Sequence, residues 1–219
     1  INTENIALTF LVTVVPLTAG KMYVIRAAHN TPPKGRLWTG SWGSLETCST
    51  SYPYSGFLGA AVNQGDDVHI LFSRTIPATG WPSENYGDVV YAKRTYGSGW
   101  GSTVIVQDNA YIRPATLSVN VTSGVLYAFW QDEPTSGHIY YKKCVSGTWD
   151  TDPTDFLPES GRRTSAYYRD YGGKIAVVYA KSPSPYSVRH ALIGELYPTV
   201  DSLTLDLTGA SYKGVKALL

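Results

Sequence analysis

The sequence predicts an all-β fold built from repeats of about 50 residues, and three observations support this prediction. Apolar residues occur in short runs rich in Val, Ile, Tyr and Thr, bounded by turn-forming residues. Four of these runs, which begin at residues 20, 67, 124 and 173, can be superimposed, so successive copies start 47, 57 and 49 residues apart. Each copy then continues through a Pro-containing loop into a second apolar run.

Each copy supplies the strands of one small sheet. The first strands are expected in ALTFLVTVV, FLGAAVN, ATLSVNV and TSAYYRD. The second strands follow in GKMYVIRA, DVHILFSR, GVLYAFWQ and GKIAVVYA, and the third in RLWTG, DVVYAKR, HIYYKKC and SVRHALI. A fourth strand is clearest in STVIVQD. Because such a sheet cannot cover its own two faces, neighbouring copies must pack together, as the blades of a β-propeller do. A β-sandwich with coincidental spacing is the alternative.

The repeats divide the chain into a propeller-like region, residues 1–194, and a C-terminal tail, residues 195–219. Four units are expected near 1–48, 49–106, 107–157 and 158–194. The tail contains one more strand, VDSLTLDL, and is either a separate end or the start of a further unit. The chain begins at Ile1 without an initiator Met, which favours a processed chain or a piece of a longer one.

Composition and charge restrict the cellular location and the classes of partner. The net charge is +1 and no basic stripe is present, which argues against a nucleic-acid partner. No apolar run reaches the roughly 20 residues needed to span a bilayer. The two cysteines, Cys48 and Cys144, are either a disulfide pair or two isolated buried thiols. Charged residues make up only 16% of a Tyr-rich chain, which favours an extracellular location, on a cell surface or a virion.

Candidate ligand-binding residues gather around the Pro-rich loops. In propellers, the loops between second and third strands share one face with the segments that enter the first strand, and ligands commonly bind there. The longest such loop runs from residue 74 to residue 87 and contains an aromatic pair beside polar groups, which suits stacking on a sugar ring. The expected ligand-binding residues are Arg74, Trp81, Glu84, Tyr86, Arg113 and Asp132.

No resident cofactor or metal is expected, with one exception. Asp150, Asp152 and Asp155 form the acidic cluster DTDPTD, which is either a loose calcium site or a plain acidic turn. It lacks the Gly and the distal Glu of an EF-hand loop.

Two short turns resemble a known repeat. The sequences GSGW at 97–100 and SGTW at 146–149 are similar to the end of the Asp box of BNR propellers, the family that includes sialidases and many secreted glycan-active or glycan-binding proteins. That box reads Ser/Thr-x-Asp-x-Gly-x-Thr-Trp, and both copies here lack its Asp. The resemblance implies a propeller with degenerate boxes. The nearest match to the sialidase arginine motif, YIRP at 111–114, has its Ile and Arg inverted, so no catalytic role is carried over to Arg113.

The sequence therefore predicts a noncatalytic extracellular or surface module that binds glycans or partner proteins through its propeller loops. One alternative is a propeller-type glycoside hydrolase or polysaccharide lyase. Another is an architectural subunit of a filament, layer or virion, in which the chain assembles with itself.

Overall fold

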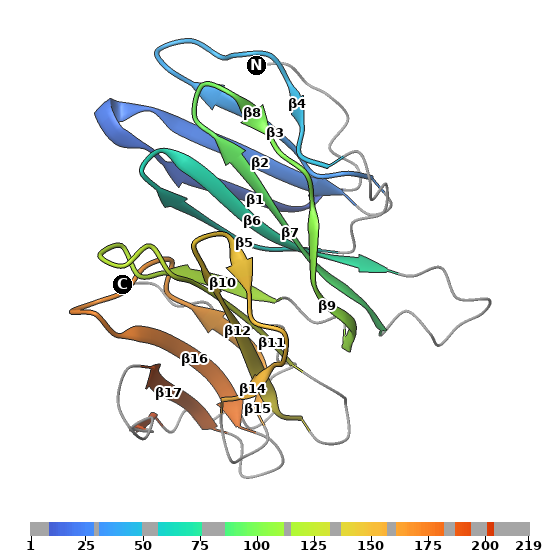
Figure 1. The fold of residues 1–219 in the computed structure, drawn as a ribbon, viewed down its shortest axis with the longest axis vertical. Coiled ribbons are helices and arrows are strands. Elements are labelled where there is room, and N and C mark those ends of the chain that lie inside the picture. The colour runs from blue at the N-terminus through green and yellow to red at the C-terminus, as the bar shows by residue number, and fades with distance from the viewer. Residues whose placement is uncertain are drawn as a thin grey trace.

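The fold consists of four antiparallel sheets that follow one another along the chain (Figure 1). The computed structural model describes residues 9–28, 31–49, 57–75, 86–111, 115–131, 137–156, 161–181, 187–193 and 201–203. Within these ranges the chain is almost entirely β-strand, with one short 3-10 turn, η1 at Thr18–Gly20. The predicted all-β class is confirmed.

The first four strands of each sheet form a meander in which sequential strands pair. The first sheet contains β1 Thr9–Pro16, β2 Met22–Ala28, β3 Lys34–Trp38 and β4 Glu46–Thr47. The second contains β5 Phe57–Gln64, β6 Asp67–Thr75, β7 Tyr86–Thr95, β8 Gly99–Trp100 and β9 Val104–Tyr111. The third contains β10 Thr116–Val119, β11 Leu126–Gln131, β12 Ile139–Val145, β13 Thr148–Trp149 and β14 Thr154–Asp155. The fourth contains β15 Gly161–Ala166, β16 Ile175–Lys181, β17 Ser187–Ile193 and β18 Asp201–Leu203. In the second and third sheets a fifth strand, β9 or β14, pairs with the third strand of its sheet, β7 or β12.

The sheets stack in chain order, with the first and fourth at opposite ends (Figure 1). The first strand of each sheet lies against the first strand of the next, as β1 does with β5, β5 with β10 and β10 with β15. This succession of small sheets, with their first strands side by side, is the blade arrangement of a β-propeller. It differs from the β-sandwich alternative, in which two sheets would share one core.

The sheets depart from the predicted units at two places. Strand β9 ends at Tyr111, beyond the expected limit of the second unit at residue 106. The strand predicted in the tail is present as β18, which pairs with β17 and so belongs to the fourth sheet. The last strand of each sheet, which is β4, β9, β14 or β18, pairs with the third strand across a longer connection. Apolar runs alone do not indicate where such a strand stops.

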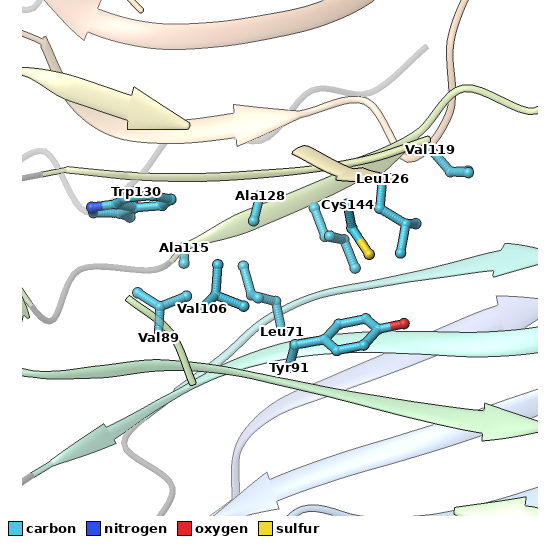
Figure 2. Close-up of a cluster of buried hydrophobic side chains, with 11 residues drawn as sticks. Leu71, Val89, Tyr91, Val106, Ala115, Val119, Leu126, Ala128, Trp130 and Cys144 are labelled. Atoms are coloured by element: carbon cyan, nitrogen blue, oxygen red, sulfur yellow. The ribbon is translucent and has the colours of Figure 1, made fainter. Parts of the chain in front are cut away.

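Three core clusters fill the spaces between successive sheets. We call the face of a sheet that meets the next sheet its forward face and the opposite one its rear face. In β6 every residue from Val68 to Ser73 is buried, because this sheet is covered on both faces. In β16 buried and half-buried residues alternate from Ile175 to Ala180, and only the rear face packs into a cluster. Figure 2 shows the cluster between the second and third sheets.

A residue with positive φ precedes the second strand of every sheet. Gly20, Gly124 and Gly173 adopt positive φ values of 70°, 73° and 81° there. The second sheet places Asp66 at this position with φ of 67°. Asp is one of the few side chains that tolerate this region, so the missing glycine does not break the repeat.

The two cysteines do not form a disulfide. Cys48 is buried in the cluster between the first and second sheets, and Cys144 in the cluster between the second and third. Both are free thiols, and the second sheet lies between them. Of the two possibilities that the sequence left open, isolated buried thiols are the one observed.

Candidate functional site

The candidate site lies at the end of the sheets where the second strands finish and the third strands begin, which we call the loop end. The opposite end, where first and second strands are joined by tight turns, is the hairpin end. In the second sheet Thr75 pairs with Gly87 and Tyr86 pairs with Tyr111, so three strands reach the loop end together. Strand β10 starts only a few residues after β9 ends, which places the third sheet's first strand at the same end.

The backbone brings two of the predicted binding residues to this end. Arg74 lies near the end of β6 and Tyr86 opens β7, on neighbouring paired strands. Asp132 directly follows β11, which ends at Gln131. Trp81, Glu84, Arg113 and Asp132 themselves lie outside the described residues, so their grouping around a ligand stays a prediction.

Buried polar side chains mark the same end of the second and third sheets. Ser73, Asp88 and Gln131 are 4%, 2% and 2% exposed, and all three lie close to the strand ends. The Oε1 atom of Gln131 is buried without a hydrogen-bond partner in the described structure. Burying polar groups is costly unless they are paired, so such residues seldom serve as plain core. No sequence pattern singled out these residues, because single polar residues at the ends of apolar runs carry no motif.

At the hairpin end, Asp66 joins the first two sheets. Its carboxylate accepts hydrogen bonds from the backbone N–H of Thr18 at 2.7 Å and from Lys21 Nζ at 2.8 Å, and a third from the Thr18 hydroxyl. The hydrogen bonds from Lys21 and Thr18 lower the pKa of Asp66 to about 2. The carboxylate is thus held ionised as a structural acceptor between sheets.

Glu46 and Arg94 form a second contact between the same two sheets. Arg94 donates two hydrogen bonds to the Glu46 carboxylate, at 2.7 and 2.8 Å. Burial opposes ionisation of Glu46, but the hydrogen bonds and charge of Arg94 outweigh it, and the pKa of Glu46 is lowered. The Tyr23 hydroxyl donates to the same carboxylate at 3.1 Å. This cluster packs into the core between the sheets and is remote from the loop end.

A third described carboxylate, Asp67, makes its contact within one sheet. Asp67 binds Lys93 at 2.7 Å within the second sheet, and its pKa is also lowered: burial opposes ionisation, but Lys93 favours it. Among the described residues, every Asp or Glu with a perturbed pKa is shifted downward. A general acid at neutral pH needs the opposite shift.

Two aspartates of the possible calcium site have separate hydrogen-bond partners. Asp150 Oδ2 accepts the backbone N–H of Lys143 at 2.9 Å, whereas Asp155 Oδ2 lies 2.7 Å from Nδ1 of His138. The two carboxylates thus face different partners. Across the described ranges, no three His, Cys, Asp or Glu side chains converge as metal ligands. Calcium binding by Asp150, Asp152 and Asp155 stays a prediction, beside the alternative of a plain acidic turn.

The two Trp turns that carried the family resemblance hold neighbouring sheets together. Trp100 donates from Nε1 to the Tyr23 hydroxyl at 3.0 Å, and the two rings meet edge to face. Trp149 packs edge to face on Tyr91, with ring centroids 5.2 Å apart. In both cases a Trp on the rear face of one sheet contacts the forward face of the previous sheet.

Comparison with known proteins identifies the fold and no family. No protein-family profile matches the chain, and no curated protein matches it. In the part of the chain that the structure describes, no helix is long and apolar enough to cross a membrane.

Three solved structures illustrate the likeness. A Trypanosoma rangeli sialidase in complex with 2,3-difluorosialic acid matches with a TM-score of 0.56 and 13% identity, over 89% of this chain and 37% of that one. The catalytic domain of Coprinopsis cinerea GH62 α-L-arabinofuranosidase matches with a TM-score of 0.55 and 12% identity, over 94% and 72%. A mutant of Aleuria aurantia lectin in complex with Fucα1-6GlcNAc matches with a TM-score of 0.52 and 11% identity, over 89% and 62%. This chain thus has a propeller-like fold and spans less than two thirds of the sialidase and of the lectin.

Proposed function

We propose that this chain is a noncatalytic glycan-binding module of propeller type, which binds its ligand at the loop end of the second and third sheets. The observation that carries the proposal is the convergence of β6, β7, β9 and β11 at that end, next to the segments that contain the predicted binding residues. Buried polar groups at the same strand ends support a recognition surface there.

The predicted residues have the chemistry that sugar recognition needs. Trp81 and Tyr86 offer aromatic faces for the apolar side of a pyranose ring. Arg74, Glu84 and Asp132 offer donors and acceptors for its hydroxyl groups. An aromatic platform flanked by hydrogen-bonding side chains can bind a sugar without a reactive centre.

Three carboxylates that the structure describes support a noncatalytic role. Glu46, Asp66 and Asp67 are all occupied in contacts that hold the strands and sheets together, and their pKa values are lowered rather than raised. The Trp turns, which we interpret as degenerate Asp boxes, likewise act between sheets. Among proteins with a similar fold, one is a lectin bound to a fucosylated disaccharide and two are a sialidase and an arabinofuranosidase. We place the module outside the cell, on a cell or virion surface.

The test is a glycan array probed with the intact chain, with Trp81→Ala as the site variant. Tyr171→Ala is the matched control, because Tyr171 is an aromatic residue 82% exposed at the hairpin end. We expect selective binding by the wild type, at least a tenfold loss in Trp81→Ala and no change in the control. Equal binding by all three proteins would place the ligand elsewhere.

The hydrolase or lyase alternative has its own readout. Incubation with a polysaccharide panel should release no sugar. Release that is abolished by Glu84→Gln or Asp132→Asn would replace the binding function with catalysis.

A further inference from the structure

The rear face of the first sheet is built like an interface between sheets, but no described strand lies in front of it. Val12 and Val14 on β1 are 58% and 55% exposed, and Trp42 is 51% exposed. Met22 and Val24 on β2 extend the same face, since they pair with Pro16 and Val14. Terminal repeats of stacked proteins normally carry a polar outer face. An apolar outer face is instead a sign of a partner.

Trp42 is the counterpart of the two Trp residues that join sheets inside the chain. Trp42 pairs with Trp38 as Trp100 pairs with Arg94 and Trp149 with Cys144. In each turn the residue after the Trp donates its N–H to the backbone carbonyl of the third strand, always at 2.9 Å. The donor and acceptor pairs are Gly43 to Leu37, Gly101 to Lys93, and Asp150 to Lys143.

The three Trp side chains therefore hold one structural position but have different surroundings. Trp100 and Trp149 each pack on a Tyr of the previous sheet. In the described structure the ring contact of Trp42 is with Trp38, edge to face at 5.1 Å, and half of the Trp42 surface is exposed. Among the described residues, no forward face of a preceding sheet covers Trp42.

Arg36 differs from its counterpart on an inner sheet in the same way as Trp42 does. Arg36 pairs with Val24 on the first sheet as Lys142 pairs with Ala128 on the third. Lys142 is buried and donates from Nζ to the backbone carbonyl of Val106, on the previous sheet, at 2.9 Å. Arg36 Nε is buried without a hydrogen-bond partner in the described structure. The Arg36 guanidinium is thus placed to donate to a backbone carbonyl of a neighbouring sheet, as Lys142 does.

The chain also carries the complementary surface, the forward face of the fourth sheet. Ala176, Val178 and Ala180 on β16 point away from the third sheet, and each is only half-buried. Their counterparts on β2, which are Tyr23, Ile25 and Ala27, are at most 2% exposed because the second sheet covers them. His190 and Leu192 on β17 pair with Val178 and Ala176 and widen this face.

We propose that a second copy of this chain packs head to tail on the first, with the forward face of its fourth sheet against the rear face of the first sheet. The interface would continue a contact that the chain already makes three times between its own sheets. Such a contact uses two different surfaces, so it closes into a ring or extends into a filament, depending on the rotation between copies. The proposal concerns a surface other than the loop end and does not depend on glycan binding.

The test is mass by light scattering on the full chain over a wide concentration range. We expect the wild type to form whole-number multiples of one chain. Trp42→Glu or Val14→Glu on the rear face, and Val178→Glu or Ala180→Glu on the forward face, should each reduce the mass to that of one chain. Val121→Glu is the control, because Val121 is 53% exposed in the turn between β10 and β11. Unchanged circular dichroism of the variants shows that they are folded, and Val14 is exposed enough to accept the change.

Mixing the variants separates head-to-tail packing from other modes. A rear-face variant keeps its forward face, and a forward-face variant keeps its rear face. A mixture of Trp42→Glu and Val178→Glu should therefore form a dimer and nothing larger. A monomeric wild type at the highest concentration overturns the proposal. So does a forward-face variant that still pairs with itself, because that result means two rear faces meet.

Discussion

Removing the Trp149 side chain tests whether the Trp turns hold the sheets together. Trp149 lies at the edge of the cluster between the second and third sheets, against Tyr91. Its Nε1 atom has no hydrogen-bond partner in the described structure, so Trp149→Ala deletes packing and no hydrogen bond. The variant therefore measures the apolar contact between two sheets.

The expected loss of stability follows from the burial of the ring. Replacing a fully buried Trp by Ala lowers the free energy of unfolding by about 3–5 kcal/mol. Trp149 is only partly buried, which places it at the lower end, at about 3 kcal/mol. The edge-to-face pair with Tyr91 accounts for about 1 kcal/mol of this. A change of this size is a large part of the stability of a typical domain.

Trp42→Ala is the matched comparison, because Trp42 occupies the same position in its turn but no preceding sheet covers it among the described residues. Its one ring contact in the described structure is Trp38, and the expected loss is about 1 kcal/mol. Unfolding in urea should be followed by far-UV circular dichroism, since removing a Trp alters fluorescence. A Val14→Glu background keeps the chains apart during the measurement.

Equal losses of stability in the two variants would contradict a role for the contact between sheets. If Trp42→Ala and Trp149→Ala lower the free energy of unfolding equally in monomeric protein, the turn itself stabilises the fold and the contact with the previous sheet does not. A loss well below 1 kcal/mol in Trp149→Ala would lead to the same conclusion.

Two further predictions concern buried titratable groups. Burial lowers the pKa of His69 to about 4, from 6.5, so the unfolded chain takes up a proton first and stability falls as the pH drops from 6.5 towards 4. The full loss is about 3 kcal/mol. In His69→Gln, the free energy of unfolding measured in urea should depend less on pH across this range. An unchanged pH dependence would contradict the assignment. Burial also raises the thiol pKa values of Cys48 and Cys144. A thiol reagent should therefore label neither in the native protein and both in denaturant, and non-reducing electrophoresis should show no cross-link within the chain.

The sequence was sufficient to predict the repeat but not the ends of its outer strands. Second strands such as DVHILFSR stand out because they are buried on both faces and contain almost continuous apolar residues. Other outer strands are short and exposed: Thr154 and Asp155 form β14 without an apolar residue. Their pairing depends on the third strand beside them, which no local pattern reveals.

The candidate site was only partly accessible to sequence reasoning. Arg74 and Tyr86 reach the loop end because strand pairing places them there, as the repeat predicted. Gln131 and Asp88 were missed, since a single buried polar residue differs from an exposed one only in the folded chain. Trp42 was missed for another reason: its turn, GSWG, is one residue shorter than GSGWG. The common hydrogen bond, and not the spacing, shows that the turns are equivalent.

The outer faces of the first and fourth sheets favour assembly over exposure to solvent. Two faces that remained exposed to solvent would be expected to carry mainly charged and polar residues. The outer face of β16 presents Ala176, Val178 and Ala180. That of the first sheet presents Val12 and Val14 beside Arg26 and Arg36, which pair with Val12 and Val24. Both faces follow the alternation of the covered sheets at the positions where a neighbour would lie. The chemistry of an interface is thus present at each end of the stack, and the two ends are complementary because each repeats one side of the same internal contact.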